Sequence, residues 1–144
     1  MFSWTAVISS ILYVGFCIIA LLRGGRPERL VATAVLLVFA ATLVLQDRTH
    51  LESAQLGIFG IDLGLLVAVL WAAFTSNRKW TLAAASFQCL TVLMHVSKLV
   101  DPRVDGWSYL TAVVIASDGV PVCLILGSLL EVRPASHRLQ SRNA

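Results

Sequence analysis

The sequence predicts an all-α integral membrane bundle of five transmembrane helices, with the N-terminus outside and the C-terminus in the cytoplasm. Hydrophobic residues make up 58% of the 144 residues and charged residues only 13%, whereas about a quarter of a soluble domain is charged. The apolar residues also gather in five runs, each near the ~20 residues that cross a bilayer. These predicted helices span residues 4–22, 30–46, 54–75, 80–100 and 107–130.

The basic residues between the runs predict the orientation. Lysine and arginine are retained on the cytoplasmic side of a membrane. The segments after the first, third and fifth runs hold eight of the eleven such residues, namely Arg23, Arg26, Arg29, Arg78, Lys79, Arg133, Arg138 and Arg142. The opposite segments hold the other three, Arg48, Lys98 and Arg103. We therefore expect one transmembrane domain, residues 1–132, with a short basic cytoplasmic tail, residues 133–144.

The first two predicted helices form a hairpin. No lysine or arginine precedes the run at 4–22, so the basic start of a secretory signal is missing and we expect the segment to be retained. Gly24, Gly25 and Pro27 then mark a tight turn before the run at 30–46.

The third predicted helix carries small residues at every fourth position: Gly60, Gly64, Ala68 and Ala72. Such a stripe lets two helices approach closely, so we expect it to pack against another helix. The alternative is that glycine and alanine are simply common in membrane helices.

The last two predicted helices, at 80–100 and 107–130, each begin with a tryptophan, which prefers the headgroup level. Asp101-Pro102 and Asp105-Gly106 form the outer turn between them.

Polar residues inside the predicted spans mark the candidate site, because ionisable groups in a bilayer usually face the protein interior or a water-filled cavity. The candidates are Asp62, Gln88, His95, Lys98 and Asp118. We expect a cluster along one cleft that opens to the outer side, with Lys98 reaching Asp62 or Asp101. The alternative is a structural role, in which these residues hydrogen-bond across helices. Asp118, near the middle of its helix, should be neutral or paired with Lys98 or a protonated His95, and is a candidate for partner binding.

Several chemistries lack support in the sequence, and no cofactor is predicted. His95 is the single histidine inside a run, which disfavours haem held by two histidines. Asp62, His95 and Asp118 could supply three metal ligands, but no local motif supports a metal site. The surroundings of the two aspartates lack the sequence blocks of intramembrane aspartyl proteases. The basic residues adjoin membrane segments, so nucleic acid is not an expected partner.

The stretch from Arg78 to Pro102, together with Gly24-Gly25-Arg26-Pro27-Glu28-Arg29, resembles uncharacterised small multispanning inner-membrane proteins of alphaproteobacteria. The resemblance implies a bacterial inner membrane and no particular activity. The sequence favours a non-enzymatic accessory or assembly subunit of a membrane complex, with a membrane-protein partner or a homo-oligomer in the lipid bilayer. A small oligomeric transporter or proton-linked module that uses the polar cluster is the alternative. An intramembrane enzyme ranks third.

Overall fold

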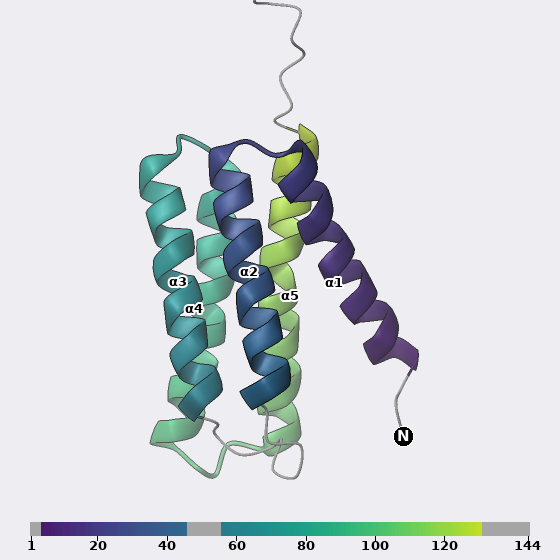
Figure 1. Cartoon of the computed structure of the whole chain (residues 1–144). Helices are drawn as coiled ribbons and strands as arrows, with labels where there is room; N and C mark the ends of the chain where they lie inside the picture. The colour runs from purple at the N-terminus through teal and green to yellow at the C-terminus, as the bar shows by residue number, and fades with distance from the viewer. Residues whose placement is uncertain (1–3, 46–55, 131–144) are drawn as a thin grey trace, which may run out of the picture.

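The computed structural model describes residues 4–45 and 56–130, and this part of the chain is entirely helical outside its turns. Five helices run alternately up and down as a bundle (Figure 1). Their bounds are α1 (Trp4–Arg23), α2 (Arg26–Leu45), α3 (Leu56–Thr75), α4 (Lys79–Val100) and α5 (Gly106–Leu130). The all-α class is therefore confirmed for the described residues.

Each helix packs against at least two others. α4 packs between α3 and α5, α2 packs on α3, and α1 contacts α5 and α2. α1 meets α5 near the end of the bundle that holds the α1–α2 turn, and it leans away from the other helices toward its N-terminal end (Figure 1). The α1–α2 and α3–α4 turns share one end of the bundle, and the α4–α5 turn lies at the other.

Four helices, α2 to α5, are long and apolar enough to cross a membrane. In α1, the part from Ser10 to Arg23 forms a shorter apolar stretch. These helices leave many large apolar side chains exposed, among them Val44, Phe74 and Val100 at 79% or more. Such a surface suits lipid rather than water.

α2 begins at Arg26, four residues before the predicted start at residue 30. Proline is tolerated in the first turn of a helix, where its missing N–H has no partner to lose. A glutamate there also interacts favourably with the positive end of the helix dipole. Pro27 and Glu28 therefore belong to the helix, and only Gly24 and Gly25 remain as the turn. The other four helices begin and end within two residues of the predicted bounds.

Two glycines of α5 let α4 and α5 pack closely. A Cβ atom added at Gly119 would overlap the ring of Phe87, and one at Gly127 would overlap the ring of Trp80. Each aromatic ring thus lies directly against the backbone of the neighbouring helix.

Most of the predicted small-residue stripe of α3 does not face another helix of the described chain. Gly60 and Gly64 are exposed, and a Cβ atom added at either would meet nothing within 4 Å. Ala68 is half-buried and Ala72 lies in the core. Within the described chain no helix packs on Gly60 or Gly64, so close packing there would need another chain.

The turn between α4 and α5 is held by polar contacts. The carboxylate of Asp105 accepts hydrogen bonds from the Ser108 backbone N–H at 2.8 Å and from the Ser108 hydroxyl at 2.9 Å. These bonds favour the charged carboxylate and lower the pKa of Asp105 below its ordinary value. Asp105 thereby satisfies a free N–H at the start of α5.

Candidate functional site

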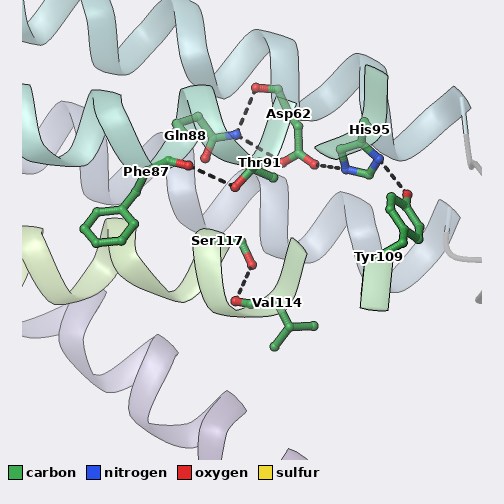
Figure 2. A network of polar contacts seen from close by, with 8 residues as sticks. All are labelled: Asp62, Phe87, Gln88, Thr91, His95, Tyr109, Val114 and Ser117. Carbon is green, nitrogen blue, oxygen red and sulfur yellow. Dashed lines mark hydrogen bonds and ion pairs between the residues drawn. The ribbon is translucent and has the colours of Figure 1, made fainter. Parts of the chain in front are cut away.

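Asp62, Gln88 and His95, three of the five predicted site residues, meet in the interior of the bundle (Figure 2). His95 Nε2 lies 3.0 Å from Asp62 Oδ2. Gln88 Nε2 donates to the Asp62 backbone carbonyl at 3.0 Å and to Asp62 Oδ1 at 3.3 Å. The side chains of α4 therefore hold both oxygens of the α3 carboxylate.

Helical spacing explains why these side chains face inward. Asp62 shares the buried face of α3 with Leu65 and Val69, three and seven residues later. Gln88 and His95 lie seven residues apart on the buried face of α4, two turns along the same side. Exposure is 7% for Asp62, 0% for Gln88 and 2% for His95, so this site is enclosed rather than open to the surface.

Tyr109 extends this group to a third helix, and the sequence reasoning missed it. Its hydroxyl lies 2.8 Å from His95 Nδ1, and its ring meets the imidazole edge-on with centroids 5.7 Å apart. The available signal was the position of Tyr109, the fourth residue of α5, just across the α4–α5 turn from the end of α4. We call Gln88, Asp62, His95 and Tyr109 the polar chain; it joins α3, α4 and α5 (Figure 2).

The polar chain is compatible with more than one protonation state. With a neutral imidazole, Nε2–H donates to Asp62 and Nδ1 accepts from the Tyr109 hydroxyl. With a protonated imidazole, both ring nitrogens donate, and the Tyr109 oxygen accepts. The observed distances, 3.0 Å to Asp62 and 2.8 Å to Tyr109, suit a hydrogen bond in either arrangement.

Lys98 lies outside the polar chain. Its Nζ atom donates to the backbone carbonyls of Val104 at 2.5 Å and Pro102 at 3.3 Å. The lysine therefore closes the α4–α5 turn, and the structure shows no pairing with Asp62 or Asp101.

Asp118 also lies outside the polar chain. It is partly exposed in the middle of α5, while Ala116 and Val120 on the other side of the helix are buried. It has no hydrogen bond or ion pair with any residue that the structure describes. The structure therefore does not bring Asp118 together with Asp62, Gln88 and His95 in the single cleft that was expected.

A second buried ionic group, Glu28 with Arg78, lies at the end of the bundle that holds the α1–α2 turn. Glu28 is fully buried, and its Oε1 pairs with the guanidinium of Arg78, whose side chain is 32% exposed. Glu28 Oε2 has no hydrogen-bond partner among the described residues. The sequence reasoning missed this pair because Glu28 was counted within a basic turn, whereas it belongs to the first turn of α2.

Neither metal binding nor disulfide formation is indicated among the described residues. No group of three histidine, cysteine, aspartate or glutamate side chains there could hold a metal ion. Cys17, Cys89 and Cys123 are free thiols. No family model, no curated protein and no solved structure matches this chain.

Proposed function

We propose that this chain is a five-span protein of the bacterial inner membrane, with the N-terminus outside and the C-terminus in the cytoplasm, which acts as a non-enzymatic accessory or assembly subunit of a membrane complex. The up-and-down arrangement of α1 to α5 supports five crossings, since α1 is a 20-residue helix like α2 and α3. The excess of basic residues near the α1–α2 and α3–α4 turns supports the orientation.

The observation that carries the subunit role is that the carboxylate and the imidazole of the polar chain are bound by other side chains of the protein. Gln88 Oε1 is the one buried side-chain atom of the polar chain without a hydrogen-bond partner among the described residues. Both oxygens of Asp62 and both ring nitrogens of His95 are engaged by other side chains, and all are buried. A site that handles a substrate needs polar groups that can reach it. In the bilayer interior, where water is scarce, such contacts hold helices together. The polar chain therefore fits the rigid framework of a subunit.

Purification of the tagged protein from its native membrane in a mild detergent tests this proposal. Mass spectrometry would identify the proteins recovered with it. We expect at least one other membrane protein in a constant molar ratio. Recovery of the chain alone, as a monomer or homo-oligomer, would contradict the subunit role.

The alternative is a proton-linked module or small transporter, and the Asp62–His95–Tyr109 part of the polar chain favours it. A carboxyl group, an imidazole and a phenol joined by hydrogen bonds are the kinds of group through which a proton can pass. Five helices are few for a transporter, so the alternative would need an oligomer. It predicts proton flux in vesicles that contain the purified protein and a pH-sensitive dye, with loss of that flux in His95→Gln.

An intramembrane aspartyl enzyme is the weakest of the three functions. Its two carboxyl groups would have to share a proton at close range. Asp62 is bound in the interior by α4 side chains, whereas Asp118 lies on the partly exposed side of α5. The two aspartates therefore do not form a dyad within the chain.

A further inference from the structure

The side of α5 that faces away from the bundle carries a regular stripe. Its members are separated by four and three residues in turn, the spacing by which one helix packs along another. All of them are exposed or partly exposed. The stripe, which we call the α5 outer stripe, consists of Thr111, Ile115, Asp118, Val122, Ile125 and Leu129.

Asp118 is the single ionisable residue of this stripe and lies at its centre. It is twelve residues from Gly106 and twelve from Leu130, so it lies ~18 Å from each end of the helix. At 100° per residue, Asp118 lies roughly opposite the buried residues Val120 and Leu124. Its carboxyl group therefore lies on the partly exposed side of α5, within electrostatic range of Tyr13 of α1, and at mid-membrane depth a charge without a partner is expensive.

Lys98 and His95, the two described residues expected as partners of Asp118, are committed to other groups. Lys98 donates to backbone carbonyls of the α4–α5 turn, and both nitrogens of His95 are bound by Asp62 and Tyr109. Neither can therefore pair with Asp118 in this arrangement. The charged carboxylate is left to a group from outside the described chain.

Pro121 leaves the backbone carbonyl of Ser117, the residue before Asp118, without its usual helical donor. Proline has no N–H, so it cannot make the helical hydrogen bond to the carbonyl four residues earlier, that of Ser117. The Ser117 hydroxyl does not compensate, because it donates to the Val114 carbonyl at 3.0 Å. Asp118 thus directly follows a residue whose backbone carbonyl lacks its usual donor, and a cation with several N–H groups suits such a pair of acceptors.

We propose that the α5 outer stripe docks a transmembrane helix of another protein that carries a lysine or arginine at mid-membrane depth, paired with Asp118. This inference rests on the proposed subunit function and names the chemistry of its partner. Basic side chains donate several hydrogen bonds and match a carboxylate, and an ion pair removes the cost of the unpaired charge. The apolar members on either side of Asp118 supply the remaining contact along the stripe.

A second copy of this chain fits the stripe less well. A two-fold contact along α5 would bring the two Asp118 side chains to the same level of the interface. Two carboxylates that share a site disfavour each other's charged form, so neither would gain a cation. Lipid alone would likewise leave the carboxylate without a donor.

A guest helix provides a direct test. The full-length protein, with a donor dye on a C-terminal tag, would be reconstituted in vesicles of phosphatidylcholine and phosphatidylglycerol. The probe would be an acceptor-labelled polyleucine transmembrane helix with one central lysine, and energy transfer would report association. We expect the lysine helix to bind the wild type about tenfold more tightly than Asp118→Asn. A polyleucine helix without lysine should not distinguish the two proteins.

Asp101→Asn is the matched control, because it neutralises an exposed aspartate in the outer turn, and it should bind the lysine helix as the wild type does. Equal binding to the wild type and Asp118→Asn, or no binding to either, would overturn the inference. Association of the wild type with labelled copies of itself, in preference to the lysine helix, would also overturn it.

The failure of this inference and that of the proposed function have different signatures in native membranes. If tagged Asp118→Asn recovers the same partners as the wild type, the docking site is wrong and the subunit role stands. If the wild type recovers no partner, the subunit role itself fails. A partner that is lost from Asp118→Asn and whose membrane helix carries a basic residue at mid-depth would support both.

Discussion

His95 shows at the scale of one residue why a bilayer interior constrains polar side chains. Without water to supply hydrogen bonds, each donor or acceptor must find its partner within the protein. The imidazole does so on both sides, with Asp62 at 3.0 Å and Tyr109 at 2.8 Å. One side chain of α4 thereby fixes how α3 and α5 are rotated about their axes.

Tyr109→Phe should destabilise the protein, because it leaves His95 Nδ1 buried without its partner and changes little else. We expect a loss of about 1–2 kcal/mol, within the range of hydrogen bonds between membrane helices. Thermal unfolding in detergent would measure it. Ser117→Ala is the control, since its hydroxyl bonds only to its own helix. Equal stability of the two variants would show that the Tyr109–His95 contact contributes nothing.

Arg78→Met should cost more than a typical surface substitution, because it strands the fully buried carboxylate of Glu28. Removal of one partner from a buried ion pair costs about 3 kcal/mol or more. Lys79→Met is the control, because Lys79 is adjacent in sequence but exposed. Unfolding by sodium dodecyl sulfate would compare the two. If both variants unfold at the same detergent concentration, the Glu28–Arg78 pair does not stabilise the bundle.

At the scale of one helix, α4 and α5 differ in how much the sequence could predict. Gln88 and His95 are seven residues apart, a spacing that places both on one face of a helix, and both face the core. No comparable pattern shows which side of α5 faces outward, because lipid-exposed and buried faces of a membrane helix are both apolar. The separation of Asp118 from the polar chain therefore could not be read from the sequence.

Glycines at different places in the bundle should respond differently to an added methyl group. Gly127→Ala places a Cβ atom against the Trp80 ring and should cost about 1–3 kcal/mol through overpacking. Gly60→Ala meets open space in the isolated chain, so its stability should be unchanged or slightly raised by better helix propensity. Thermal unfolding of both in detergent checks this. A loss at Gly60 in the isolated chain, equal to that at Gly127, would contradict the packing described.

For the whole molecule, five crossings would put the α1–α2 and α3–α4 turns on one side of the membrane and the α4–α5 turn on the other. The proposed orientation puts the first two in the cytoplasm. Asn77 and Arg103 are exposed in opposite turns and suit cysteine labelling. We expect a membrane-impermeant maleimide to label Arg103→Cys in spheroplasts, and Asn77→Cys only in inverted vesicles. The opposite result would reverse the orientation. The wild type, with its three cysteines within helices, measures the background.

The general architecture was accessible from sequence because bilayer thickness dictates the length of each run and basic residues mark its ends. The sites were accessible only in part. The sequence singles out Asp62, Gln88 and His95 as polar residues of the predicted spans, but which of the candidates touch depends on the rotation of each helix. Glu28 was not among the predicted site residues, because the proline before it indicated a turn at residues that form the first turn of α2.

The measurement that tests the account most directly compares Tyr109→Phe with Asp118→Asn in native membranes, by steady-state level and by the fraction of each in a larger complex. A structural polar chain and a docking carboxylate predict opposite results. Tyr109→Phe should lower the level while the remaining protein still assembles, and Asp118→Asn should keep the level but leave the complex. If Tyr109→Phe keeps both level and assembly yet abolishes a cellular activity of the protein, the polar chain performs chemistry and the account is wrong.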